Sequence, residues 1–533
     1  MNASPKRLLL SLALAAAAAG TQAQIDTRPV PAQPRASGLP ANWQHGVFME
    51  IFVRGYQDSD GDGIGDLKGL TRRLDYLKKL GISGIWLMPI TASSDHDHGY
   101  ATTDYRGIEP QYGTLADFDE LIREAHKRGI GIVMDYVINH SSYQFPPFQA
   151  ALKDRASPWR SWFVWNPDPG PGWDIWGKVP WYDAATQPWT FTGALKDLPP
   201  FKSGSPDIYF GTFGPHMPDF NMRNPAVVKY HEDSLRFWLN RGLDGYRLDA
   251  VPHFIENNAK DWNDQPESRA LTKQFQDLIK SYPGRYAVCE ATAEPIAYGE
   301  PGLCGGAFAF NQNYELMKAA KGDAAAVQKL ADYYRAMKPE MATFLHNHDI
   351  FTGQRVWDQL RGDEARYRLA AASYLLLPGT PFVYYGEEIG QAGIDAPPDS
   401  DAPLRSPMSW TAAGGFTSNA TPFRPLALNR SRHNADSQQR DAGSLFNFYR
   451  ELIALRRASP ALTLGRYEAD QVNGQVWTFQ RVFGKERVLV AINYGDQPAA
   501  LDLPARARLL HPKKAAGTTL PPLSLRVYRL EAQ

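Results

Sequence analysis

A cation and a carboxylate stand two residues apart at the end of a short apolar run. Arg247 and Asp249 belong to the stretch 243–249, and because side chains alternate along a strand, both point to the same face. An arginine placed in this way keeps a neighbouring carboxylate ionised and oriented, which makes Asp249 a candidate nucleophile. The same spacing also suits a buried structural ion pair. The choice depends on what the rest of the chain brings to this place.

Other apolar runs also end in polar residues. His140 follows the run 130–138, Glu290 ends the run 286–290, and His348 and Asp349 follow a later run. A second carboxyl group near a carboxylate could serve as a proton donor beside a nucleophile. One or two buried polar residues at strand ends are usually structural groups with satisfied hydrogen bonds. Four strands that end in this way at one rim are hard to explain by packing alone.

The remaining sequence supplies elements that would position these residues. From Val47 onward, strand-like runs alternate with helical patterns, including one helix expected over 314–337, and this alternation predicts parallel strands joined by helices. The strand-like runs are 47–53, 82–88, 130–138, 243–249, 286–290, 306–310, 342–346 and 381–385. With 445–456 as the last helix there are eight strand-and-helix units. They predict an α/β fold, a (β/α)8 TIM barrel, with its chemistry at the C-terminal ends of the strands.

The alternation is interrupted once and ends before the C-terminus. Residues 140–221 are rich in Trp, Pro and Gly with little periodicity, so we expect an inserted subdomain after the third strand. The barrel then comprises 43–139 and 222–460. Short strands separated by turns predict a C-terminal antiparallel β-sandwich domain over 461–533. We expect most tryptophans of the insertion to fill its core and one or two to touch a ligand.

The N-terminus has the layout of a secretory signal peptide over residues 1–23. Lys6 and Arg7 precede an apolar run over 8–19 that is too short to span a bilayer. We therefore expect cleavage near Ala23, export to the periplasm or the medium, and no membrane anchor. The Pro- and Ala-rich stretch 24–42 is expected to be a linker or a disordered arm.

Charge and cysteine content narrow the range of partners. Lys plus Arg and Asp plus Glu both number 57, so no charge bias favours nucleic acid. Cys289 and Cys304 are the only cysteines, and the sequence leaves open whether they form a disulfide. We expect a monomer whose stability comes from its core.

Several sequence motifs follow one another in a fixed order along the chain. The main ones are Asp-Tyr-Val-Ile-Asn-His at 135–140, Gly-Tyr-Arg-Leu-Asp-Ala-Val-Pro-His at 245–253, Glu290, and Asn-His-Asp at 347–349. Two further motifs are Gly-Ile-Trp-Leu-Met-Pro-Ile at 84–90 and Met-Pro-Asp-Phe-Asn at 217–221. With these motifs the chain resembles the α-amylase superfamily of glycoside hydrolases, from about Val47 through the C-terminal β domain. Any one motif alone would be weak, whereas together they are very specific.

The resemblance implies a role for each motif residue. Asp249 would be the nucleophile of a retaining double displacement. Glu290 would protonate the leaving oxygen and then activate water, with the two carboxyl groups roughly 5–5.5 Å apart. Asp349 would bind sugar hydroxyls as the ring distorts, and Glu294 is a rival acid that misses the motif position. The other residues expected to contact the sugar are Arg247, His140, His348, His253 and Tyr100.

A loop of aspartates indicates a calcium site. Asp58, Asp60, Asp62 and Asp66 take positions 1, 3, 5 and 9 of this loop, and the carbonyl of Ile64 is a further candidate ligand. Hard oxygen ligands at this spacing suit Ca²⁺, although the loop lacks the acidic twelfth residue of an EF-hand. A polar turn is the alternative, but a turn would not need four mutually repelling carboxylates. Members of the resembled family carry calcium at this place.

Three positions bear on the substrate. Asp97 and Arg405 resemble exo-acting relatives, in which an Asp and an Arg close the pocket around a terminal glucose. Phe220, in the motif 217–221, instead resembles subfamilies that include exported α-amylases, and it stands where Leu is commoner. Ala101 departs from the Asp that usually follows the motif tyrosine.

From the sequence alone we favour an α-amylase that cleaves α-1,4 bonds of starch, maltodextrin or maltooligosaccharide. An exo-acting α-glucosidase, oligo-1,6-glucosidase or transglucosylase is the alternative. An alternative of another class is a non-catalytic relative that binds carbohydrate or assists a transporter. The presence together of Asp249, Glu290 and Asp349 argues against that alternative, because a protein without catalysis has no need of all three.

Overall fold

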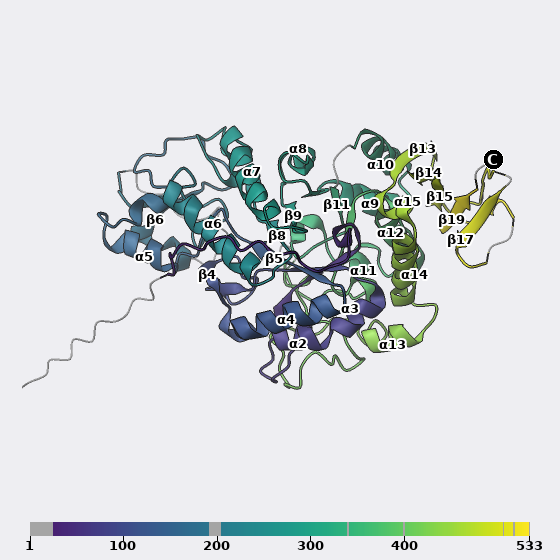
Figure 1. The fold of residues 1–533 in the computed structure, drawn as a ribbon, viewed down its shortest axis with the longest axis horizontal. Coiled ribbons are helices and arrows are strands. Elements are labelled where there is room, and N and C mark those ends of the chain that lie inside the picture. Colours follow the sequence, from purple (N-terminus) through teal and green to yellow (C-terminus); the bar gives the residue numbers. More distant parts are fainter. Residues whose placement is uncertain are drawn as a thin grey trace, which may run out of the picture.

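A computed structural model describes residues 25–190, 204–337, 341–397, 400–504, 506–514 and 517–531. The predicted signal peptide lies outside these residues. Within them no helix is both long enough and apolar enough to cross a membrane. Figure 1 shows a central barrel, with the segment that carries α5 and β6 at one end of the long axis and a C-terminal sheet at the other.

Eight parallel strands close into the predicted barrel, in the order β1-β12-β11-β10-β9-β8-β5-β2. Neighbouring strands keep an unshifted parallel register, for example Phe48 opposite both Gly84 and Phe382. The strands are β1 (Phe48–Ile51), β2 (Gly84–Leu87), β5 (Gly131–Tyr136), β8 (Gly245–Leu248), β9 (Tyr286–Cys289), β10 (Ala307–Phe308), β11 (Met341–Thr343) and β12 (Thr380–Tyr384). Each lies within or next to a run predicted from the sequence.

Helices follow the strands and surround the barrel (Figure 1). The longer ones are α4 (Leu115–Lys127), α6 (Pro225–Asn240), α7 (Pro266–Lys280), α9 (Gln312–Ala320), α10 (Ala324–Ala336), α12 (Glu364–Leu376) and α14 (Leu445–Ala458). Shorter ones are α1 (Val53–Tyr56), α2 (Leu67–Arg72), α3 (Leu74–Leu80), α5 (Pro146–Lys153), α8 (Pro295–Gly299), α11 (Val356–Gln359), α13 (Ala435–Arg440) and α15 (Pro460–Leu464). The single helix expected over 314–337 is two helices. Gly322, at φ +93°, ends α9, and the Asp323 side chain accepts the N–H groups of Ala325 and Ala326 to begin α10.

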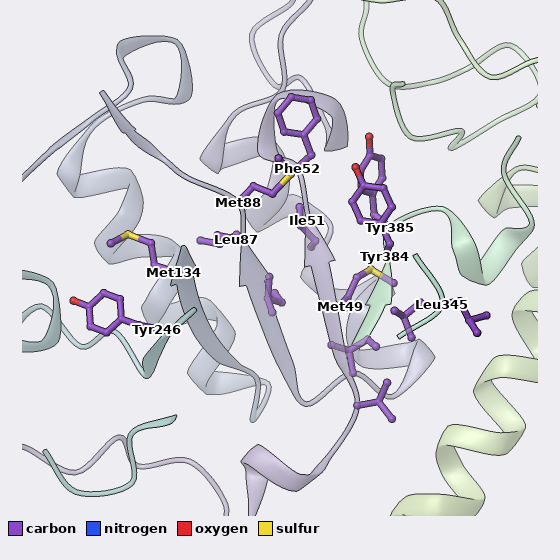
Figure 2. Close-up of a cluster of buried hydrophobic side chains, with 14 of the residues drawn as sticks. Met49, Ile51, Phe52, Leu87, Met88, Met134, Tyr246, Leu345, Tyr384 and Tyr385 are labelled. Atoms are coloured by element: carbon purple, nitrogen blue, oxygen red, sulfur yellow. The ribbon is translucent and has the colours of Figure 1, made fainter. Parts of the chain in front are cut away.

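The alternation along β1 separates the interior of the barrel from its outer surface. Phe48 packs inside the barrel with other aromatic rings, whereas Met49 and Ile51 belong to the larger core between strands and helices, which Figure 2 shows. A Cβ on Gly84 would lie 2.3 Å from the Phe48 ring, so only glycine allows that ring to fill the barrel. Glu50 shares the inner face with Phe48 by the same alternation, and it is buried at the end of the strand.

The stretch 25–42 is not a disordered arm. Although it contains no regular element through residue 40, its backbone is fixed to the barrel helices: the N–H of Val30 donates to Asp233, and the N–H of Gln33 donates to Asn240 and to the Tyr282 hydroxyl. Its low apolar content does not prevent ordering, because α6 and the residues just after α7 supply the hydrogen-bond partners. The structure therefore contradicts the disordered arm, whereas the linker stays a prediction.

Two additions flank the barrel as predicted. The segment inserted between β5 and β8 contains α5 and the antiparallel pair β6 (Trp181–Asp183) and β7 (Ile208–Phe210). A further antiparallel pair, β3 (Thr91–Ser93) and β4 (Thr102–Ile108), follows β2. The C-terminal domain is an antiparallel sheet in the order β13-β14-β15-β19-β17, with the pair β16-β18 beside it. Their bounds are β13 (Arg466–Asn473), β14 (Val476–Phe483), β15 (Glu486–Asn493), β16 (Ala499–Ala500), β17 (Ala507–His511), β18 (Thr519–Leu520) and β19 (Ser524–Leu530).

Candidate active site

Three strand ends bring carboxylates to one arginine. Arg247 on β8 is only 1% exposed, and its Nη1 lies 2.8 Å from Asp135 Oδ1 at the end of β5. The same nitrogen contacts Asp249 Oδ1, and Nη2 lies 3.0 Å from Glu290 Oε2 just beyond β9. A single guanidinium group therefore holds both carboxyl groups that the sequence assigned to nucleophile and acid.

The charges around Asp249 act in opposite directions. Burial raises the pKa of Asp249 well above its ordinary value, Arg247 opposes the shift, and the nearby Glu290 and Asp135 add to it. Burial also raises the pKa of Asp135 to about 6, again with Arg247 as the main opposing charge. A carboxylate can attack carbon only when it is ionised. Arg247 is therefore the group that favours the reactive form of Asp249.

Glu290 is fixed by its neighbours in the chain. Its Oε2 accepts the N–H of Ala250 at 3.1 Å in addition to the contact with Arg247. Cys289, the last residue of β9, forms a disulfide with Cys304, which settles the pairing that the sequence left open. The rival acid Glu294 is exposed at the start of α8 and is not among the residues that line the cavity described below.

Asp349 and Arg405 form a second charged group at the rim. Arg405 is 3% exposed, and its Nη2 lies 3.2 Å from Asp349 Oδ1 and 2.9 Å from Asp401 Oδ2. Asp97 reaches the same arginine at 3.5 Å and also pairs with Arg424 at 2.7 Å. Burial raises the pKa of Asp349 to about 7, and Arg405 is the main charge that opposes the shift.

Tyr100 and His348 together connect the two charged groups, because His348 Nε2 also lies 3.2 Å from Asp349 Oδ2. Its hydroxyl donates to Asp135 Oδ2 at 2.8 Å and lies 2.8 Å from His348 Nε2, and the two rings stack with centroids 5.5 Å apart. His348 Nδ1 lies 2.6 Å from Glu50 Oε1 at the end of β1. The structure thus places His348 behind Tyr100, where it orients that side chain, and a direct contact of His348 with a sugar stays a prediction.

The sequence analysis did not name Glu50 as a site residue. It is the only charged residue in the otherwise apolar run 47–53, and an isolated carboxylate on a buried strand is costly without a partner. This lone charge in an apolar strand could have identified Glu50 as a site residue. Arg424 carried no comparable signal, because only the fold brings it to Asp97.

The predicted residues meet around one cavity of about 630 Å³. Eight of them line it: Tyr100, His140, Arg247, Asp249, His253, Glu290, Asp349 and Arg405. Burial lowers the pKa of His140 to about 3 and that of His253 to about 4, so both imidazoles are neutral near pH 7. Within the described residues, His140 Nε2 and His253 Nδ1 have no hydrogen-bond partner, and both are thus available to a ligand.

Phe220 is a correction to the sequence analysis. Its ring is 1% exposed, stacks on Phe163 with centroids 5.4 Å apart, and packs against Tyr105 and His231. It does not line the cavity. An aromatic ring in a small inserted subdomain is used for its core, so Phe220 acts on substrate choice at most through packing. A second cavity of about 880 Å³, between the insertion and residues 256–260, contains none of the site carboxylates.

The aspartate loop is only partly assembled as predicted. Carboxylate oxygens of Asp58, Asp60 and Asp66 all lie within 4.8 Å of one another, which is compatible with ligation of one cation. Asp62 is not part of this group, and its Oδ1 accepts the N–H of Ile64 instead. The Thr417 hydroxyl donates to Asp58, so the loop is attached to a segment far along the chain.

A closed (β/α)8 barrel with two carboxyl groups and an arginine at its strand ends carries the groups that a glycoside hydrolase needs. The family assignment follows from comparison. The chain belongs to the alpha-amylase family, because the family model described as the alpha amylase catalytic domain matches residues 50–465.

Its relatives include enzymes with different named activities. The trehalose synthase/amylase TreS of Mycobacterium tuberculosis (strain CDC 1551 / Oshkosh) is 32% identical over 484 residues, which cover 81% of this chain and 78% of the relative. The oligo-1,6-glucosidase of Parageobacillus thermoglucosidasius is 27% identical, with 87% of this chain and 92% of the relative covered. Among solved structures, the alpha-glucosyl transfer enzyme XgtA matches 91% of this chain and 99% of its own, with a TM-score of 0.79 and 27% identity.

Proposed function

We propose that this protein is a retaining α-glucosidase or α-glucosyl transferase that acts on the terminal glucose of short α-glucosides. The observation that carries the proposal is the ion-paired wall formed by Asp97, Asp349, Asp401, Arg405 and Arg424. Arg405 lines the cavity, and its guanidinium group is bound on several sides. A glucan chain that continued past the reacting sugar at this side would have to displace these partly buried pairs and leave the buried Arg405 without its carboxylate partners, which is costly.

The relatives support the same choice. A trehalose synthase/amylase, an oligo-1,6-glucosidase and an alpha-glucosyl transfer enzyme are among the similar proteins. These names favour exo action or transfer over the endo-acting α-amylase that the sequence favoured. The cleavage of α-1,4 bonds within starch is therefore the second candidate.

The proposed reaction is a double displacement. The proton of Glu290 moves to the glycosidic oxygen while an Asp249 oxygen bonds to the anomeric carbon, and the alcohol leaves. Because Oε2 of Glu290 already accepts from Ala250 and contacts Arg247, we assign the transferred proton to Oε1. In the second step water or another alcohol gives its proton to Glu290 and attacks the same carbon, which releases Asp249. Retention of the α configuration follows from the two inversions.

Products formed early from maltoheptaose test this proposal. We expect glucose and maltohexaose as the first products of hydrolysis, or maltohexaose and maltooctaose where glucose is transferred to a second maltoheptaose. Released glucose should be in the α form by NMR, and Asp249→Asn should give no product. Products of intermediate length at the earliest times would instead identify an endo-acting α-amylase. If folded wild-type protein and Asp249→Asn were equally inert on all α-glucosides, the enzyme proposal would fail in favour of a binding protein.

A second measurement addresses the wall directly. We expect Arg405→Ala to raise KM for maltose about tenfold or more, because a hydrogen-bonded charge at the terminal glucose is lost. Arg432→Ala is the matched control, since Arg432 is exposed in the same segment and has no part in the wall. Equal KM values for the two variants would contradict the role of the wall.

We also propose a structural Ca²⁺ held by Asp58, Asp60 and Asp66. The convergence of three carboxylates supports it, and bound calcium would neutralise their repulsion and hold the loop against the segment that contains Thr417. The ion takes no part in the bond-breaking steps above.

Export as a monomer is a further part of the proposal. Residues 6–23 have the signal-peptide layout, and the Cys289–Cys304 disulfide suits an oxidising compartment. N-terminal sequencing of the protein from cell fractions tests this: an N-terminus near residue 24 in the periplasm or the medium is expected, and an intact Met1 in the cytoplasm would contradict it. Light scattering of the purified protein tests the monomer, because a dimer would show twice the mass of one chain.

A further inference from the structure

A chain of short contacts runs from the end of β1 to the site carboxylates. Glu50 Oε1 lies 2.6 Å from His348 Nδ1. His348 Nε2 lies 2.8 Å from the Tyr100 hydroxyl, which in turn lies 2.8 Å from Asp135 Oδ2. Each contact holds one hydrogen between two polar atoms, and the partners of those atoms decide which of the two carries it. The direction of the whole chain therefore follows once one end is fixed.

The Asp135 end accepts hydrogen bonds. Its Oδ1 accepts from the Arg247 guanidinium group at 2.8 Å, and its Oδ2 accepts from the Trp86 indole N–H at 3.2 Å. Its pKa of about 6 leaves the carboxyl group ionised at pH 7, and an ionised carboxylate has no hydrogen to donate. The Tyr100 hydroxyl therefore donates its one hydrogen to Asp135.

The Tyr100 oxygen then offers only lone pairs to its other neighbours. Arg247 Nη1 donates to one of them at 3.3 Å. A bare nitrogen of His348 at 2.8 Å would direct its own lone pair at the other, which is repulsive, so Nε2 must carry a hydrogen and donate it. The same N–H lies 3.2 Å from Asp349 Oδ2, a second acceptor.

The other ring nitrogen of His348, Nδ1, decides the role of Glu50. Burial lowers the pKa of His348 well below its ordinary value, and three nearby groups add to the shift: Arg405, Arg247 and His98. The ring is therefore neutral near pH 7, and with a hydrogen on Nε2 its Nδ1 has only a lone pair. An ionised carboxylate 2.6 Å away would repel that lone pair. The Glu50 carboxyl group must then carry a proton and donate it.

The groups that face Glu50 agree with a retained proton. Burial raises the pKa of Glu50 well above its ordinary value, Asp349 and Asp135 add to the rise, and Arg247 opposes it. Tyr384 is the partner of Glu50 in the register of β1 and β12. Burial also raises the pKa of the Tyr384 hydroxyl well above its ordinary value, so this neighbour is uncharged. An uncharged tyrosine does nothing to favour the ionised form of Glu50.

We propose, on the basis of the proposed function, that Glu50 is a positioning residue that works in its protonated form. It donates to His348 Nδ1 and thereby keeps the hydrogen of His348 on Nε2. The Tyr100 hydroxyl is then turned toward Asp135, and the Tyr100 ring is held where it lines the cavity. Glu50 is not among the described residues that line the cavity, so it acts on the bound glucose through His348 and Tyr100. A neutral Glu50 also adds no negative charge that would disfavour the ionised form of Asp249.

Infrared difference spectroscopy tests the proton on Glu50. The C=O stretch of a carboxylic acid absorbs apart from the amide and carboxylate bands. The spectra should be recorded slightly above neutral pH, because Asp349, with a pKa of about 7, is then largely ionised. We expect the difference between wild type and Glu50→Gln to contain one carboxylic-acid band. If that band is missing, Glu50 is ionised and the inference is overturned.

The kinetics of two substitutions test the positioning role. Glutamine keeps the size of Glu50 and offers an amide N–H to Nδ1, so Glu50→Gln should keep kcat/KM for maltose within about threefold of wild type. Leucine offers no donor and leaves Nδ1 buried without a partner, so Glu50→Leu should lower kcat/KM about 10- to 100-fold. Equal losses in the two variants, or no loss in Glu50→Leu, would overturn the inference.

Glu388→Leu is the matched control. Glu388 is also buried and accepts the Tyr76 hydroxyl at 2.6 Å, but in the described part of the chain it does not line the cavity. Its replacement should lower the melting temperature and leave kcat/KM unchanged, and a loss equal to that of Glu50→Leu would overturn the inference. If Glu50→Leu does not fold, the infrared spectrum still decides, because it needs only Glu50→Gln. A wild type without turnover of any α-glucoside would overturn the proposed function, whereas the spectrum tests the proton on Glu50 independently.

Discussion

Replacement of Arg247 by methionine tests the electrostatic design of the site. Methionine fills part of the same volume without a charge. Arg247 contacts Asp135, Asp249 and Glu290, and burial already raises the pKa of Asp249. Without the arginine that rise is unopposed, so the protonated, unreactive form of Asp249 should persist to higher pH.

The size of the effect follows from the contacts. Removal of one partner of a buried ion pair costs about 3–5 kcal/mol, and one pKa unit corresponds to about 1.4 kcal/mol. The pKa of Asp249 should therefore rise by roughly two to three and a half units. Asp135, whose pKa is about 6, can take up a proton in the variant and so reduce the repulsion on Asp249. The rise in the pKa of Asp249 should therefore lie near two units.

The assay is kcat/KM for p-nitrophenyl α-glucoside measured across the pH range in which the protein stays folded. Departure of p-nitrophenolate, a good leaving group, depends little on proton donation by Glu290. Because the nucleophile reacts when deprotonated, the activity of Arg247→Met should be lowest at acid pH, about 100-fold below wild type, and should rise about tenfold per pH unit toward the new pKa.

Arg456→Met is the matched control for that experiment. Arg456 is also 1% exposed, but it donates to the carbonyls of Leu375 and Leu377 outside the site. Its replacement should lower the melting temperature without moving the pH profile. A loss in Arg247→Met by the same factor at every pH would refute the electrostatic reasoning and leave Arg247 only a geometric role.

Three further predictions follow from the same structure. Glu290→Gln should lower kcat/KM on methyl α-glucoside about 10²- to 10⁴-fold, whereas Glu294→Gln should stay near wild type; a comparable loss in both would reassign the acid. EDTA should lower the melting temperature of wild type and of Asp62→Asn, because Asp62 lies outside the carboxylate cluster. It should have little effect on Asp60→Asn, because that variant lacks one of the three proposed ligands. An unchanged wild-type melting temperature in EDTA, with no calcium by elemental analysis, would exclude the metal. Cys304→Ser removes a disulfide between residues 15 apart in sequence and should lower the free energy of unfolding by about 3 kcal/mol. Urea denaturation with and without reductant measures this loss. Unfolding curves of wild type and variant that coincide without reductant would contradict it.

The barrel and its carboxyl groups could be predicted from the sequence because both follow from local patterns. The two-residue alternation assigns Arg247 and Asp249 to one face, and the eight-fold repeat of strand and helix places all strand ends at one rim. Glu290 was distinguished from Glu294 by its position in the family motif, and the structure places it directly after β9. The ordering of the stretch 25–42 could not be predicted, because its composition says nothing of the partners on α6.

By itself, then, the sequence determined the fold class, the family and the residues that carry the chemistry. Only the tertiary structure decided which side chains reach them. It joined Asp97 to Arg405 and Arg424, moved Phe220 into the core, and brought Trp176 and Phe351 to the lining of one cavity. The physical reason is that strand periodicity is a local property of the backbone, whereas contacts between loops depend on closure of the barrel and on packing between segments far apart in the chain.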